Sequence, residues 1–150
     1  MYISRGNNLI TTDPTNTKLY KQYQGNYNQF YDTYYPSNIT LLVNPQPDND
    51  TVFDNIEYKT EVYLDNIDQP NITLSKVQLY NEYQNSGLVP IIPGRQSNAR
   101  RRFRDWNVML PREEGTRNRI RNPWVYLKVQ FDNEDNYKLI LHSIIVSYSV

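Results

Sequence analysis

Residues 124–149 read WVYLKVQFDNEDNYKLILHSIIVSYS, and this stretch decides the fold of the chain. Apolar and more polar residues alternate up to Phe131, and an alternation returns after the polar run DNEDN. A repeat of two residues is typical of a β-strand with one buried face. We therefore predict a long antiparallel hairpin, strand 124–131 against strand 137–149. Strict alternation then places one set of side chains of the second strand on a common face: Tyr137, Leu139, Leu141 and Ile145.

Further β-strands are predicted upstream of this hairpin. Turns rich in Asn, Asp, Pro and Gly separate short segments of strand composition, at residues 39–43, 51–64, 72–83, 88–92 and 102–110. Pro90 marks the segment 88–92 as an edge or a bulge, because proline has no N–H to donate. About seven strands with regular turns indicate an all-β fold, an antiparallel β-sandwich. We predict that residues 38–150 form this sandwich.

The first 37 residues differ from the rest in being rich in Tyr and Asn. Their irregular pattern predicts an extended arm over residues 1–37 that packs on another surface. The tyrosines between Tyr20 and Tyr35 partly follow a three-to-four spacing, which also allows one short helix. The sequence leaves these two alternatives open.

Composition excludes several classes of protein. The chain has no cysteine, which excludes disulfides and thiolate metal sites and fits assembly in a reducing cytoplasm. No apolar run approaches the roughly 18 residues of a membrane span. Fourteen tyrosines offer large apolar rings with polar tips, which offset the low content of aliphatic residues.

Nine of the ten arginines lie between Arg95 and Arg121, where there is no lysine. That segment carries a net charge of +6, whereas residues 1–94 carry −5. Guanidinium groups pair with carboxylates, phosphates and aromatic rings. We weigh three interpretations: a solvated face, a nucleic-acid surface and a subunit interface, of which the interface is favoured. The residues that we expect to contact a protein partner or DNA are Arg100, Arg101, Arg102, Arg104, Arg117, Arg119, Arg121, Trp106 and Trp124.

Catalysis and metal binding have little support in the sequence. His142 is the one histidine, it lies in the middle of a predicted strand, and no cysteine accompanies it. Acidic turns at 48–54 and 132–135 offer oxygen ligands for calcium, but their spacing does not match an EF-hand loop. We therefore predict a protein that is not an enzyme and has no cofactor and no metal site.

Long ordered motifs resemble the C-terminal region of the tail-associated stabilisation or muzzle-type virion proteins of crAss-like bacteriophages. The resemblance runs from about Gly25 to Val150 and rests on GNYNQFYDTYYPSNITLLVNP, VFDNIEYKTEVY, LYNEYQNSG, RRRFRDWNVMLPR, NRIRNPWVYLKV and NYKLILHSIIVSYSV. It implies a structural protein of the phage tail, assembled in the bacterial host cytoplasm. Copies of the chain, with neighbouring tail proteins, would form part of a ring around the DNA exit path and help retain and eject the genome. Packaged double-stranded DNA is the alternative contact.

A second function class remains open from the residues alone. β-Sandwiches commonly carry carbohydrate-binding or receptor-binding sites in which aromatic rings stack on sugars. The aromatic residues that we consider for such a site are Tyr31, Tyr34, Tyr35 and Trp124.

Overall fold

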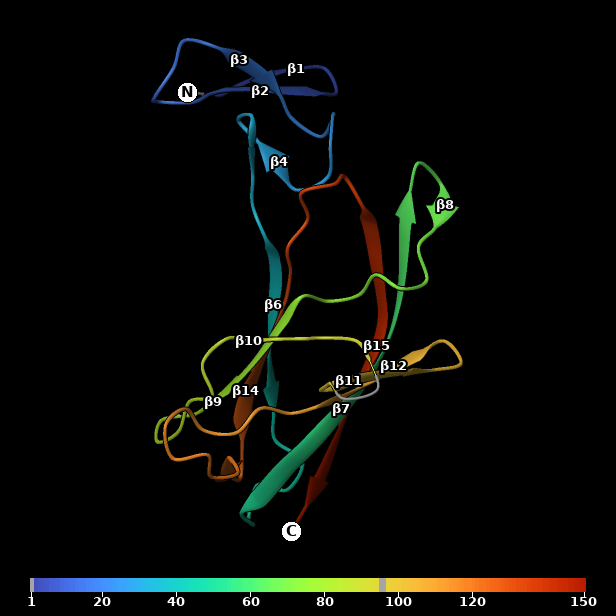
Figure 1. Cartoon of the computed structure of the whole chain (residues 1–150). Coiled ribbons are helices and arrows are strands. Elements are labelled where there is room, and N and C mark those ends of the chain that lie inside the picture. Colours follow the sequence, from blue (N-terminus) through green and yellow to red (C-terminus); the bar gives the residue numbers. More distant parts are fainter. Residues whose placement is uncertain (1, 95–96) are drawn as a thin grey trace.

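The computed structural model describes residues 2–94 and 97–150, and within these ranges it contains strands and no helix (Figure 1). The strands of the N-terminal part are β1 (Tyr2–Arg5), β2 (Asn8–Thr12), β3 (Leu19–Lys21), β4 (Gln29–Phe30) and β5 (Thr33–Tyr34). The remaining strands are β6 (Ser37–Val43), β7 (Thr51–Leu64), β8 (Ile67–Asp68), β9 (Lys76–Tyr80), β10 (Val89–Pro90), β11 (Ala99–Arg102), β12 (Asp105–Met109), β13 (Arg121–Asn122), β14 (Val125–Phe131) and β15 (Lys138–Ser149).

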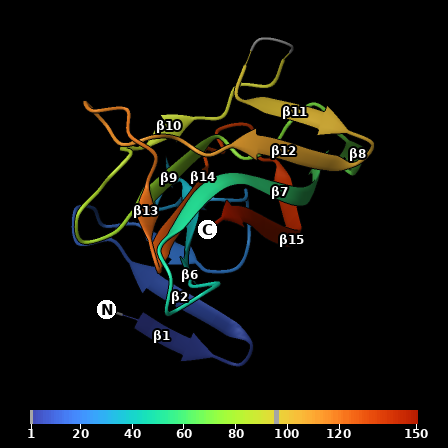
Figure 2. The same cartoon turned by 90° about the horizontal axis from the view of Figure 1, so that it is seen from below.

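Two antiparallel sheets form the body of the molecule. The first has the strand order β10-β9-β14-β6. In the second, β11, β12 and β7 are neighbours, and β15 pairs with β7. Because β15 pairs with β7 from Val52 to Val62 and beyond, β12, β13 and β8 must all lie along the other edge of β7. Figure 2 shows the two sheets from their end. This arrangement confirms the all-β antiparallel β-sandwich.

One apolar core joins the two sheets. Its largest fully buried side chains include Ile56 and Tyr58 from β7 and Leu127 from β14. The Tyr58 hydroxyl lies 2.8 Å from the Thr73 hydroxyl, so the one polar atom of this buried ring has a partner. Burial raises the pKa of Tyr58 to about 12. The ring is therefore neutral at physiological pH and behaves as a core residue.

The predicted hairpin between residues 124–131 and 137–149 is wrong. β14 pairs with β6 on one side and β9 on the other, whereas β15 pairs with β7 in the opposite sheet. The alternation was interpreted correctly for β14, where Val125, Leu127, Val129 and Phe131 are all buried. Since β14 is a central strand, both of its edges are occupied and β15 has none to pair with. The two strands therefore lie in different sheets and bury their apolar side chains in the same core.

Strict alternation also fails in the middle of β15. The register against β7 shifts between Leu141 and Ser143, which is a β-bulge. One extra residue in a strand moves every later side chain to the other face. Ile144 and Val146 consequently pack on the core, and Ile145 is 59% exposed. The expectation that Ile145 shares a face with Leu141 is wrong for this reason.

The connection between β14 and β15 is built around Asn133, whose exposed fraction is only 3%. Its side-chain amide donates to the Tyr137 carbonyl at 2.6 Å, and its oxygen accepts from the Tyr137 N–H at 2.9 Å. This pair of hydrogen bonds closes the loop at the point where the chain crosses from one sheet to the other. Asn133 thus replaces the backbone pairing that a tight hairpin would have supplied.

Replacing Asn133 by alanine is expected to lower the free energy of unfolding by about 1–3 kcal/mol, because both backbone groups of Tyr137 lose their partner. Urea denaturation followed by fluorescence measures the change. Asp135→Ala, an exposed substitution in the same loop, is the control and should stay within about 0.5 kcal/mol of the parent. An Asn133→Ala protein as stable as this control would contradict the role of Asn133.

The end of β14 is fixed to β9 by an ion pair. The Lys76 ammonium lies 2.8 Å from a carboxylate oxygen of Asp132, and the Gln130 amide donates to the same group at 2.7 Å. The hydrogen bond from Lys76 and then that from Gln130 hold the pKa of Asp132 below its usual value. A depressed carboxyl pKa stabilises the fold when the group is ionised in both states.

Asp132 is therefore expected to make stability fall at acid pH. Its contribution to the free energy of unfolding should be complete above about pH 5. It should disappear as the pH falls through and below about 4, the ordinary pKa of an aspartate in the unfolded chain. Comparing the urea midpoints of the parent and Asp132→Asn at pH 7 and pH 3 checks this. The difference should shrink on acidification, and a difference that is constant with pH would contradict it. Because both side chains of the ion pair are partly exposed, solvent screening keeps the effect on stability small.

The N-terminal residues were predicted to be irregular, but in the structure they form short strands. β1, β2 and β3 form a three-stranded antiparallel sheet, and β4 and β5 form a small hairpin. The residues considered for a short helix lie in these strands and the turns between them. Five residues between 23 and 32 have a positive φ, which turns the chain repeatedly and prevents a helix: Tyr23, Gly25, Asn28, Tyr31 and Asp32. The boundary at residues 37 and 38 remains a prediction.

Candidate partner-binding surface

The arginine run forms a strand of its own, which the sequence interpretation missed. β11 is the outer strand of its sheet and pairs with β12 from Ala99 opposite Val108 to Arg102 opposite Asp105. Phe103 and Arg104 make the two-residue turn, and the positive φ of 58° at Phe103 is typical of such turns. The strand predicted at 102–110 is present as β12 at Asp105–Met109, whereas residues 102–104 belong to the end of β11 and the turn.

The pleat of this hairpin divides the arginines between its two faces. Arg101 is paired with buried Trp106 and so points to the core side, where its guanidinium lies 5.9 Å from the centre of the indole ring. Arg100 and Arg102 take the opposite face, as successive residues of a strand must. Arg101 and Arg104 also line a polar pocket of about 150 Å³ with Asp68 and Gln69. Arg100 and Arg102 are thus the outward pair.

The arginines at 117–121 form a second cluster. Arg119 makes an ion pair with Asp54 at 2.9 Å, and Arg121 lies in β13 opposite Val52. Arg117 and Arg119 line an open groove of about 760 Å³ beside the loop that follows β12. β13 pairs with β7 at residues 51–52, whereas the arginine hairpin reaches Lys59. Arg100 lies opposite Asn107, which pairs with Glu57, and Glu57 is only three residues along β7 from Asp54, the partner of Arg119. Asn107 lines the same groove as Arg117 and Arg119, so the two clusters lie on adjoining parts of one surface.

The two tryptophans of the predicted site do not join the arginines in one surface. Trp106 is 3% exposed and belongs to the core, so it offers almost no surface to a partner, and the Arg101 guanidinium lies over its ring. Trp124 precedes β14 in the other sheet and lies edge-on to Tyr126, with 5.2 Å between ring centres. Tyr126 in turn lies 5.2 Å from Tyr80. The sequence did not predict this row of three aromatic rings on the outer face of the first sheet. The alternation in β14 does place Tyr126 on that face.

The tyrosines considered for sugar stacking are engaged within the N-terminal part. Tyr31 packs edge-on against Tyr20 at 4.9 Å and donates its hydroxyl to Thr11. The Tyr34 hydroxyl accepts from Asn26, and Tyr35 packs on Phe30. Trp124 lies beside the other end of β6, because Val125 pairs with Val43. About 20 Å of strand separate the two ends, so these four rings form no common platform.

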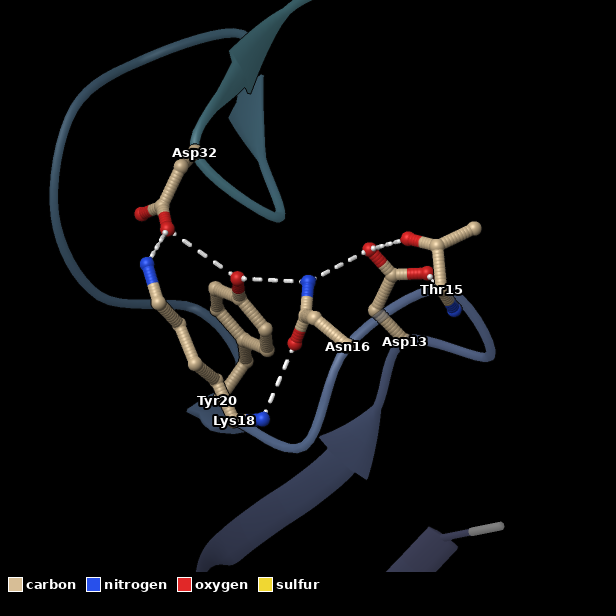
Figure 3. A network of polar contacts seen from close by, with 6 residues as sticks. All are labelled: Asp13, Thr15, Asn16, Lys18, Tyr20 and Asp32. Carbon is tan, nitrogen blue, oxygen red and sulfur yellow. Dashed lines mark hydrogen bonds and ion pairs between the residues drawn. The ribbon is translucent and has the colours of Figure 1, made fainter.

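A polar network fixes the shape of the N-terminal strands (Figure 3). Lys18 forms an ion pair with Asp32 at 2.8 Å, and the Tyr20 hydroxyl donates to the same carboxylate at 3.0 Å. Asn16 connects Tyr20 to Asp13. The hydrogen bond from Lys18 holds the pKa of Asp32 below its usual value, and bonds from Thr15 do the same for Asp13. These contacts link β3 to the β4–β5 hairpin.

The structure gives the single histidine a partner at the surface. His142 Nε2 lies 3.4 Å from Glu61, which also accepts a hydrogen bond from the Tyr63 hydroxyl at 3.0 Å. No group of three metal-ligating side chains gathers in residues 2–94 and 97–150. Within those same ranges no helix is long and apolar enough to cross a membrane. Arg95, the first arginine of the run, lies outside the described residues.

Comparison with known proteins agrees with the resemblance noted in the sequence. The family described as the crassvirus muzzle protein C-terminal domain matches residues 25–113. The chain is 31% identical over 134 residues to the muzzle protein of Bacteroides phage crAss001, covering 87% of this chain and 10% of that protein. It thus spans about a tenth of the length of this curated relative. These matches confirm that the chain belongs to the crassvirus muzzle protein C-terminal domain family.

Proposed function

We propose that this chain is a structural component of a phage tail, assembled in the host cytoplasm. Copies of it would form part of a ring around the DNA exit path, with neighbouring tail proteins, and help to retain and eject the genome. Membership of the muzzle family supports a structural role in the virion. The ring, its contact with DNA and its part in ejection are the finer steps of this proposal.

The observation that carries the proposal is the exposed arginine strand at one edge of the sandwich. Arg100 and Arg102 are exposed on the outward face of β11, and neither has an intrachain ion pair among the described residues. Exposed carboxylates lie elsewhere on the same chain, at Asp48, Asp50 and Glu82. Opposite charges on two different patches suit a heterologous contact, which is the kind that closes a ring. Arginine is also enriched at such contacts.

Sedimentation velocity on virion-derived material and on the purified chain tests the ring. We expect a species of several copies that dissociates as salt rises, because exposed charge pairs are screened. Free monomer under every condition would rule out self-assembly through this surface.

DNA is the competing partner for the same arginines, and it makes a different quantitative prediction. If phosphates are neutralised, the logarithm of the affinity for duplex DNA falls linearly with the logarithm of the salt concentration, with a slope of about −0.9 per phosphate. Fluorescence anisotropy at several salt concentrations measures this slope. A flat dependence removes direct DNA binding and leaves the protein interface.

A carbohydrate-binding module is the second candidate, and the row of Trp124, Tyr126 and Tyr80 is the observation that favours it. Tyr126 is exposed and Trp124 and Tyr80 are partly exposed, so the row presents aromatic surface against which a sugar ring could stack. A glycan array with the parent and with Trp124→Ala tests it. Hits that depend on Trp124 would support this function, and an array without hits would count against it.

A further inference from the structure

The four outer edges of the sandwich are not equally protected. A free strand edge pairs readily with another chain, and proteins prevent this with short strands, proline or charged residues. β10 has two residues, one of them Pro90, and β11 carries three arginines. β6 has no charged residue, and β15 has none from Ser143 to Ser149. Two edges of the sandwich therefore lack these protective features.

Both unprotected edges lie on the same side of the sandwich. On the opposite side a bridge between Pro93, which follows β10, and Ala99, the first residue of β11, joins the two sheets. β6 pairs only with β14 and β15 only with β7 among the described residues. An apolar groove of about 390 Å³ opens between these two strands, lined among others by Ile39, Leu74, Val129, Phe131, Leu139 and Leu141. This open side offers free backbone groups and apolar side chains together.

The N-terminal strands also leave apolar side chains and one strand edge uncovered. No described residue from 2 to 50 is buried, although this part contains many apolar side chains. Tyr2 is 77% exposed, Ile3 49% and Leu19 68%. Among the described residues β1 pairs only with β2, so its other edge has no strand partner there. The sheet β1-β2-β3 thus has apolar surface and a free strand edge but no core of its own.

The N-terminal sheet is joined to its own sandwich by few contacts. The Tyr27 N–H donates to Asn136 at 2.8 Å, and the Asn28 amide donates to Ser37. Both contacts lie in the segment that leads from β3 to β6. They hold the sheet beyond the end of the sandwich at which β6 begins (Figure 1). In this position β1 pairs with neither β6 nor β15 of the same chain.

We propose that the sheet β1-β2-β3 of one copy docks on the open side of a second copy, with β1 adding to the outer edge of β15. This inference rests on the proposed self-assembly. Ile3 would then lie beside Ile145 on the exposed face of β15, and Tyr2 would take the opposite face, toward the groove between β6 and β15. The free backbone groups of both edges would pair. Strand addition is a known mode of recognition, in which main-chain hydrogen bonds give affinity and apolar pockets give specificity. The contact is heterologous, since β1 and β15 are different surfaces.

Cysteine crosslinking between two single variants tests this pairing without background, because the chain has no native cysteine. Ile3→Cys is mixed with Ile145→Cys, which is 59% exposed on β15, and a short bismaleimide is added. We expect a covalent dimer in this mixture only. Ile3→Cys mixed with Tyr83→Cys, 79% exposed in the loop after β9, is the control and should give no dimer.

Each other outcome overturns a defined part of the inference. No crosslink in a sample that still sediments as a multimer would refute the docking of β1 and leave the ring intact. A dimer from Ile145→Cys alone would show a two-fold pairing of β15 with itself, which also refutes it. A monomer with no crosslink at any concentration would refute the proposed self-assembly as well.

Protecting the edge of β15 provides an independent test. The double variant Ser143→Arg and Ile145→Arg places two arginines at exposed positions of β15, as protection of the kind that β11 already has. We expect self-association to weaken by at least about tenfold, since burying an unpaired charge in an apolar contact is costly. Met109→Arg, on an exposed position of β12, should leave association unchanged. Equal association of the double variant and the parent would overturn the proposal, provided that both show the same circular dichroism.

Discussion

Trp106→Ala is expected to lower the free energy of unfolding by about 3–5 kcal/mol, the range for removing a large aromatic side chain from a core. Trp106 is 3% exposed and packs in the apolar cluster with Tyr58, its partner across the strand pair. Guanidinium chloride denaturation at pH 7 measures the loss. The prediction gives Trp106 a role in stability, whereas the sequence suggested a surface contact.

Trp124→Ala is the matched control for this prediction. Trp124 is half-buried and contacts Tyr126 on the outer face of the other sheet, so its removal leaves no closed cavity. The stability loss should be clearly smaller than that of Trp106→Ala. Similar losses for the two variants, or a loss below about 1 kcal/mol for Trp106→Ala, would show that Trp106 is not a core residue.

Reversing the charge of the outward pair, Arg100→Glu with Arg102→Glu, is expected to weaken self-association by at least about 30-fold, which corresponds to about 2 kcal/mol. The reason is that these two guanidinium groups face solvent on an outer strand and have no intrachain ion pair among the described residues. Sedimentation velocity over a range of concentrations measures the association constant. The unfolding free energy should change by less than about 0.5 kcal/mol, because both side chains are exposed.

Arg101→Glu with Arg104→Glu is the comparison that makes this prediction specific. These two side chains line the pocket that contains Asp68, and Arg101 also contacts the Trp106 ring. Their reversal removes contacts within the chain and should cost stability with a smaller effect on association. If this pair weakens association more than Arg100 and Arg102 do, the pocket is the contact surface. If neither pair changes association, the interface proposal for β11 fails.

Strand positions were largely predictable, because a strand with one buried face shows its period in the sequence. Residues 51–64 were predicted as a strand, and β7 has those bounds. The inward face of β14 was also predicted correctly. The first strands of the chain escaped notice because they have no buried face, and a pattern of burial cannot appear where nothing is buried.

The candidate site was predictable as a set of residues but not as a surface. The density of arginines identifies the segment, whereas the direction of each side chain depends on the turn at Phe103 and Arg104. That turn sets the register of β11 against β12, which places Arg101 opposite buried Trp106 and Arg100 on the outward face. The distance between the two arginine clusters depends on where β12 and β13 pair along β7. Neither the direction of the arginine side chains nor the distance between the clusters is determined by neighbouring residues in the sequence.

By itself the sequence determined an all-β sandwich, the positions of its long strands and membership of the muzzle family. Alternation, turn residues and long motifs are local features, and each acts without reference to the rest of the chain. Only the tertiary structure decided that β14 and β15 lie in different sheets and that a bulge reverses the faces of β15. The physical reason is that backbone hydrogen bonds are the same for every pair of strands. Side-chain periodicity therefore specifies which face is buried, while the choice of partner depends on how the whole core packs.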